Sequence, residues 1–146
     1  MPTTIPTASA AELASVLRPA LLRLTRIVRN QRADQSVTLT QLAALATLAK
    51  HGPMSARELA AAENVQPPSM TKVLANLEEH GMVAREPHPT DGRQVVLEAT
   101  DAGRRLLAEE SRSRDAWLSR RLTNLGAEER SLLERVVPLL DKLAEQ

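Results

Sequence analysis

Polar and cationic side chains gather in two short segments of this sequence. Hydroxyl and amide groups both donate and accept hydrogen bonds, and lysine and arginine donate strongly to anionic oxygens. Such groups suit recognition of a polar, negatively charged surface. The candidate residues are Pro68, Ser69, Thr71, Lys72 and Asn76 in the first segment, and Arg85, Asp91 and Arg93 in the second.

Catalytic chemistry is not indicated. The sequence has no cysteine, which excludes a thiol nucleophile and a cysteine-based zinc site. His51, His80 and His88 are scattered at no helical pair spacing, and we find no nucleophile–base pair and no glycine-rich phosphate loop. We therefore expect no enzyme, no catalytic residue, no metal and no cofactor.

The size and composition favour a small helical protein. The chain has 146 residues, is rich in alanine, leucine, arginine and glutamate, and has one aromatic residue, Trp117. It contains no apolar run near the roughly 20 residues that a membrane span needs, and no apolar signal segment at its start. We expect a cytoplasmic protein that does not bind membranes.

The charge distribution does not by itself indicate nucleic-acid binding. The net charge is +1, and five arginines without an acid lie in residues 18–32. The segment 55–99, which contains both candidate clusters, is slightly acidic, whereas nucleic-acid binders usually present a basic surface. Its charged residues include Arg57, Lys72, Arg85 and Arg93 against Glu58, Glu63, Glu78, Glu79, Glu86 and Asp91.

The order of the expected elements is more informative. Capping boxes, in which a Ser or Thr and a Glu or Gln three residues later satisfy the free amides of a helix start, begin at Ser9, Thr38 and Ser55. Pro67 and Pro68 open a further helix that ends at His80-Gly81. Strand-like stretches follow at 82–86 and 94–99, joined by turn-forming residues, and then two helices at about 101–122 and 127–144.

These elements predict a mainly α fold with a small β-hairpin wing. We expect a disordered arm at 1–8, a dimerisation helix within 9–37, a winged helix-turn-helix at 38–99 and C-terminal dimerisation helices at 100–146. Its recognition part spans roughly Ser55 to Ala99. In such folds the second helix of the motif enters the DNA major groove and its N-terminal residues contact base edges.

The helix that begins at Gln66 has the corresponding two faces. Met70, Val73, Leu74 and Leu77 recur at helical spacing and predict a buried face. Pro68, Ser69, Thr71, Lys72 and Asn76 lie away from it, and their short side chains, apart from Lys72, suit close approach to a groove. The alternative is an ordinary solvated face, and the turn before the helix and the hairpin after it favour DNA contact.

The hairpin tip adds a second candidate contact. Arg93, beside Asp91 and Gly92, could insert into a narrow minor groove, where negative potential is concentrated. Asp91 could orient Arg93, or could pair with Arg85 across the hairpin. The alternative is an exposed ion pair that only shapes the loop.

The stretch from Thr38 to Gly103 resembles the MarR family of bacterial regulators, and the flanking helices match that family's layout. The similarity rests on segments 55–60, 66–72 and 77–83, on Arg85, Asp91 and Arg93 in the wing, and on Thr100 and Gly103. The sequence departs from the family at Gly92, where a basic residue is common, and at Ala99, where leucine is common.

The resemblance implies a homodimer on a pseudo-palindromic operator, with Ser69, Thr71 and Lys72 on the recognition helix and Arg93 at the wing tip. Apolar stripes on the outer helices, including Leu106, Leu118 and Leu140, also favour pairing of two chains. We expect a sequence-specific DNA-binding transcription regulator, a repressor released by a small-molecule effector of unknown identity. The alternative is a winged-helix module for protein–protein contact without DNA binding, which the acidic segment favours slightly.

Overall fold

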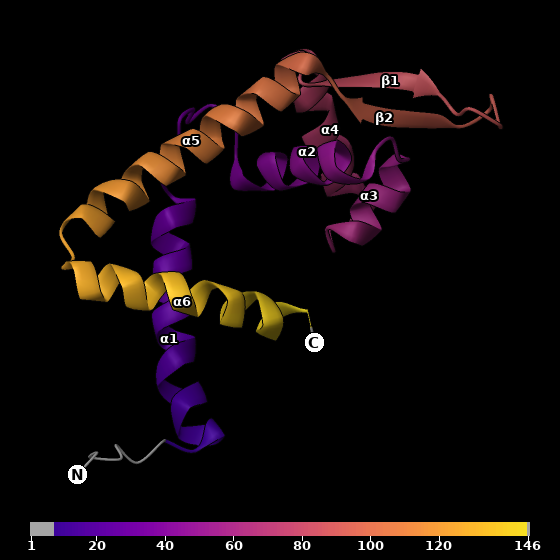
Figure 1. The fold of residues 1–146 in the computed structure, drawn as a ribbon. Helices are drawn as coiled ribbons and strands as arrows, with labels where there is room; N and C mark the ends of the chain where they lie inside the picture. Colours follow the sequence, from indigo (N-terminus) through magenta and orange to yellow (C-terminus); the bar gives the residue numbers. More distant parts are fainter. Residues whose placement is uncertain (1–7, 146) are drawn as a thin grey trace, which may run out of the picture. The chain divides into compact units, whose positions relative to one another are not determined.

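The computed structural model describes residues 8–145, so residues 1–7 of the expected N-terminal arm lie outside the described residues. The described chain forms helices and one two-stranded hairpin, in the order of Figure 1. The elements are α1 (Ala10–Arg29), α2 (Leu39–His51), α3 (Ala56–Ala62), α4 (Pro67–Glu79), β1 (Val83–Pro87), β2 (Val95–Ala99), α5 (Asp101–Thr123) and α6 (Ala127–Ala144).

The chain divides into two compact units. The winged unit comprises Arg32–Arg112, and the helical unit comprises the described residues up to Gln31 together with those from Ser113 onward. Helix α5 contributes its first half to the winged unit and its second half to the helical unit. The mainly α fold with a hairpin is as the sequence predicts.

Local sequence signals determine where three helices begin. The side chains of Ser9, Thr38 and Ser55 each accept a hydrogen bond from the backbone amide three residues on. The side chains of Glu12, Gln41 and Glu58 each accept one from the backbone amide of the cap residue. This reciprocal bonding satisfies amides that a helix start otherwise leaves unpaired. All three predicted capping boxes are confirmed.

The core of the winged unit lies between α2, α3, α4 and the hairpin. Its fully buried side chains include Leu45 and Leu48 of α2, Leu59 of α3 and Leu74 of α4. Gly103 brings the start of α5 against this core, because a Cβ atom there would collide with the carbonyl oxygen of Met82 and lie 2.9 Å from Cδ1 of Leu45. Only a residue without a side chain permits this approach.

The hairpin is antiparallel, with Val83 opposite Ala99 and Pro87 opposite Val95. The first strand lies one residue later than predicted, and the second begins one residue later. On its other side, Leu97 exchanges two backbone hydrogen bonds with Met54, at 2.8 and 3.2 Å. The hairpin is therefore tied to the segment that leads into α3, while its tip extends away from the helices of the winged unit (Figure 1).

The helical unit leaves much of its apolar surface uncovered. Helices α1 and α6 contain no buried residue, although both are amphipathic. Val16 of α1 is 64% exposed and Leu143 of α6 is 61% exposed. Trp117 of α5 is half-buried, and the guanidinium carbon of Arg121 lies 5.1 Å from its ring centroid.

One predicted apolar stripe is divided differently from expectation. Leu106 is buried in the core of the winged unit, and Leu107 packs against that core. Leu106 is therefore not available to a partner, because the first turns of α5 complete the core of the winged unit. Among residues 8–145, no helix is both long and apolar enough to cross a membrane.

Candidate nucleic-acid interface

A tight turn connects α3 to α4. Asn64 adopts a left-handed backbone with φ of 51°, a conformation that asparagine tolerates better than most residues. The amide of Val65 donates to the carbonyl of Ala60 at 2.9 Å, which closes the turn. Pro67 then begins α4 without a side-chain cap. The amide of Ser69 has no hydrogen-bond partner among the described residues, so this positive helix end can receive an anion.

The exposed face of α4 carries four of the five residues predicted for it. Pro68, Ser69, Thr71 and Lys72 are all exposed, and the opposite face buries Met70, Leu74 and Leu77. The Thr71 hydroxyl donates to the carbonyl of Pro67 at 3.0 Å, which leaves its oxygen lone pairs as an outward acceptor. Ser69 and Lys72 supply the free donors of this face.

Asn76 differs from the other four candidates. It is half-buried, and its Oδ1 accepts a 2.9 Å hydrogen bond from Nε2 of Gln41. Gln41 also accepts the Thr38 amide at 2.9 Å with its Oε1, so its side chain joins the start of α2 to α4. The capping box identifies Gln41 in the sequence, but its contact with Asn76 can be recognised only in the folded structure.

The hairpin places Arg85 and Asp91 in separate contacts. Arg85 Nε donates to Oε1 of Glu78 at 2.6 Å, which ties β1 to the last turn of α4. Asp91 Oδ1 instead accepts the backbone amide of Arg93 at 3.1 Å. The predicted alternative of an Arg85–Asp91 pair is therefore wrong, because Arg85 pairs with Glu78 of α4 and Asp91 bonds within the tip. The Arg93 side chain is exposed at the tip.

Several acids of this region have structural partners. Glu58 accepts the Ser55 amide at 2.8 Å, Glu63 accepts the Thr47 hydroxyl, and Glu78 pairs with Arg85. Their carboxylates are needed for caps and inter-element contacts within the unit. The acidic composition of the segment therefore reflects its internal bonding as well as its surface.

A buried ion pair joins the loop before α2 to α5. Arg32 Nε lies 3.3 Å from Oε2 of Glu110, with side chains 8% and 1% exposed. Glu110 Oε1 accepts the Asp34 amide at 3.0 Å, and Arg32 Nη2 donates to the carbonyls of Asp34 and Val37. The sequence does not predict this cluster, since nothing in the local pattern indicates that Asp34 and Glu110, 76 residues apart, are partners.

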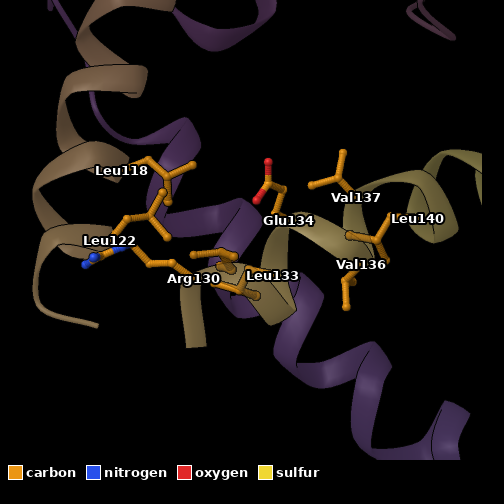
Figure 2. A pocket seen from close by; sticks show the side chains of 9 residues that line it. Leu118, Leu122, Arg130, Leu133, Glu134, Val136, Val137 and Leu140 are labelled. Atoms are coloured by element: carbon orange, nitrogen blue, oxygen red, sulfur yellow. The ribbon is translucent and has the colours of Figure 1, made fainter. Parts of the chain in front are cut away.

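The helical unit contains an apolar groove of about 400 Å³ between α1, α5 and α6. Figure 2 shows leucine and valine side chains of α5 and α6 around it, with Arg130 and Glu134 as its charged members. Its lining residues are Leu24, Leu118, Leu122, Arg130, Leu133, Glu134, Val136, Val137 and Leu140. No cluster of three or more His, Asp or Glu side chains suited to a metal ion occurs within residues 8–145.

Comparison with known proteins agrees with this architecture. The sequence pattern of the MarR family matches residues 37–95. The HTH-type transcriptional regulator ML2140 of Mycobacterium leprae is 43% identical over 138 residues, which cover 94% of this chain and 96% of that protein. The HTH-type transcriptional repressor MdtR of Bacillus subtilis is 30% identical over 94% of this chain and 91% of its own length.

The fold is likewise similar to a solved structure of a MarR family protein from Bacillus stearothermophilus. The TM-score is 0.71 at 25% identity, with 93% of this chain and 95% of that chain covered. Near-complete coverage by sequence and structure, together with the exposed α4 face and the hairpin, leads to one assignment: the chain belongs to the MarR family of HTH-type transcriptional regulators.

Proposed function

We propose that this regulator represses transcription by binding a pseudo-palindromic DNA operator as a homodimer. The observation that carries the proposal is the exposed N-terminal half of α4, with Ser69 and Lys72 as free donors beside the unpaired Ser69 amide. Short side chains there allow close approach to base edges, and the amide suits a phosphate. Arg93 at the exposed wing tip is the proposed minor-groove contact.

A DNA-binding assay over a range of salt concentrations tests the proposal. Overlapping duplexes from the region upstream of the protein's own gene are titrated with the protein, and fluorescence anisotropy is measured. We expect one duplex to bind more tightly than a mixed-sequence duplex, with affinity that falls steeply as salt rises, by about 0.9 log units per log unit of salt for each phosphate contacted. Absent or salt-insensitive binding would favour the alternative, a module for protein–protein contact.

Homodimer formation is supported by the uncovered apolar surface of the helical unit. Two amphipathic helices without a buried residue, and a groove lined by leucine and valine, form a patch that a stable monomer would rarely expose to water. A second copy of the same surface would cover it, as isologous dimers do. The two recognition helices would then be presented about 34 Å apart, one turn of DNA.

Sedimentation velocity at micromolar concentration tests the dimer. We expect the wild type to sediment as a dimer and Val137→Glu, which places a charge at the groove, to sediment as a monomer. Leu39→Glu is the matched control, since Leu39 is an exposed leucine of the winged unit. A monomeric wild type would overturn this part of the proposal.

The repressor role is supported by MdtR, a relative that is named a repressor. A reporter gene placed behind the bound upstream region tests this role, because deletion of a repressor gene raises expression of the reporter.

We also propose that a small-molecule effector releases the protein from DNA. A decrease in the anisotropy of the labelled duplex when a candidate compound is added measures this release. A regulator that contacts DNA works where the DNA lies, which for a bacterial regulator is the cytoplasm.

A further inference from the structure

His88 occupies the turn at the tip of the wing. Its ring Nδ1 accepts the backbone amides of Thr90 at 3.2 Å and Asp91 at 3.1 Å, and the Thr90 hydroxyl lies 3.2 Å from the same atom. The amide of His88 donates to the carbonyl of Gln94 at 3.0 Å across the hairpin. His88 is half-buried, whereas residues 89–94 are exposed. A single ring nitrogen thus contacts the Thr90 amide, the Thr90 hydroxyl and the Asp91 amide in an otherwise exposed loop.

The turn that His88 holds leads directly to Arg93. Asp91, whose amide is bound to the ring, accepts the Arg93 amide with its Oδ1 at 3.1 Å and the Gln94 amide with its carbonyl at 3.0 Å. The bonds therefore run from His88 through Asp91 to Arg93. The Arg93 amide is thus bonded to a residue whose own amide is bonded to the His88 ring.

Only one protonation state of His88 supports these bonds. A nitrogen that accepts two amide protons must carry a lone pair, so the ring is neutral with its proton on Nε2. In the imidazolium both ring nitrogens are donors, so Nδ1 would lose both amide bonds and keep only the Thr90 hydroxyl oxygen as an acceptor. The charged side chains nearest to His88 in the hairpin sequence are Arg85 and Glu86 on β1 and Asp91 and Arg93 in the tip, and Arg85 is paired with Glu78.

We propose that His88 is a positioning residue for DNA binding, whose neutral ring holds the wing tip in the conformation that presents Arg93 and whose protonation releases it. The inference rests on the proposed function, since it concerns the wing as a DNA contact. Its sign follows from proton counting: the DNA-competent tip binds one proton fewer, so affinity for DNA falls as the pH decreases. Attraction of a cationic ring to phosphate would act in the opposite direction, but at an exposed loop salt screens it.

Two substitutions separate the effect of the hydrogen-bond acceptor at residue 88 from the effect of its change of charge. In His88→Asn the amide oxygen can accept the amides two and three residues on, as asparagine does in turns, and it does not titrate. In His88→Ala the acceptor is lost at every pH. His51 and His80 remain in both variants, so differences between wild type and His88→Asn report on His88 alone.

Anisotropy titrations with the tightest-binding upstream duplex run between about pH 5.5 and pH 8, the range in which histidine side chains in proteins commonly change charge. We expect wild-type affinity at pH 5.5 to be about fivefold below that at pH 8, relative to His88→Asn, as for the net loss of about one hydrogen bond. His88→Ala should be about fivefold weaker than His88→Asn at pH 8, with the same pH profile as His88→Asn. Parallel profiles for wild type and His88→Asn, or a wild type that tightens in acid, would overturn the proposal.

NMR of the free protein gives a test that needs no DNA. At pH 8 the ring nitrogen shifts should identify the Nε2–H tautomer, and on acidification the amide signals of Thr90, Asp91 and Arg93 should move together with the ring in wild type but not in His88→Asn. Amide signals that do not follow the ring would refute the positioning role. If no duplex binds any variant, the DNA-binding proposal fails, while this experiment still decides whether His88 holds the tip.

Discussion

Gln41 Nε2 lies 2.9 Å from Oδ1 of Asn76, which links the capping box of α2 to α4, the proposed recognition helix. One amide side chain therefore has two roles, in starting a helix and in fixing the side chain of a helix packed beside it. The bond also sets which end of the Asn76 amide is free, and leaves its NH₂ group available to an acceptor outside the protein.

A double-mutant cycle measures that link. We expect Gln41→Ala and Asn76→Ala to show a coupling of about 0.5–1.5 kcal/mol in the free energy of unfolding, as for one hydrogen bond. Thr38→Ala with Asn76→Ala is the control pair, since Thr38 shares the capping box but its hydroxyl bonds to the Gln41 amide and not to Asn76. Unfolding in urea provides the measurement, and additive Gln41 and Asn76 effects would contradict the link.

The two exposed cations of the interface should affect DNA binding in different ways. Lys72→Ala should reduce the slope of log affinity against log salt by about 1 if Lys72 meets phosphate, equally for all sequences. Arg93→Ala should weaken binding most at duplexes with an A-tract beneath the wing, where the minor groove is narrow. Lys142→Ala in α6 is the control, because it removes one positive charge outside the assigned contact surface. If both variants bind like the parent, the assigned contact surface is wrong.

The buried pair between Arg32 and Glu110 should matter far more for folding than the exposed pair between Arg85 and Glu78. Glu110→Ala leaves a buried guanidinium without its partner and should cost about 3–5 kcal/mol in unfolding free energy. Arg85→Ala breaks a pair whose arginine side chain is 51% exposed and should cost under about 1 kcal/mol. Arg32→Met with Glu110→Leu should recover most of the loss, and a double variant as unstable as Glu110→Ala would argue against this account.

Gly103 should tolerate no side chain. Gly103→Ala places a Cβ against the Met82 carbonyl and close to Leu45, so backbone must shift, at a cost of about 1–3 kcal/mol. Gly92→Ala is the matched control, because nothing lies within 4 Å of a Cβ at that position, and its effect should stay within about 0.5 kcal/mol. Thermal unfolding of the two variants compares them, and equal stability would contradict the close approach.

Asp34 should titrate below its ordinary range. Hydrogen bonds from the Ser36 side chain and backbone hold the pKa of the Asp34 carboxyl below its ordinary value. A carboxyl with a lowered folded-state pKa stabilises the fold above its unfolded pKa, and this contribution is lost as the pH falls through the folded value. Carboxyl ¹³C titration should show the lowered pKa in the folded protein, and Ser36→Ala should raise it. An unchanged pKa in that variant would show that the Ser36 side chain has no effect.

The helix starts and the buried face of α4 could be predicted from local sequence patterns. Helix starts at Ser9, Thr38 and Ser55 follow from bonds that close within four residues, so sequence spacing alone specifies them. The buried face of α4 follows from helical periodicity, and places Ser69 and Lys72 outside without knowledge of the fold.

Contacts between distant segments were not predictable in this way. Several acids lie near Arg85 in the sequence, and only the packing of β1 against α4 selects Glu78 over Asp91. Glu110 looks like any charged residue of an exposed helix until the loop at Arg32 covers it. His88 reads as a loop residue because its three partners depend on the conformation of the turn.

Trp117 has a consequence for how the molecule can be observed. It is the chain's one aromatic residue besides histidine, with no tyrosine or phenylalanine, and it lies in the half of α5 that belongs to the helical unit. Intrinsic fluorescence therefore reports that unit alone, while the winged unit emits nothing. Emission followed alongside far-ultraviolet circular dichroism can separate the melting of one unit from that of the other without any label.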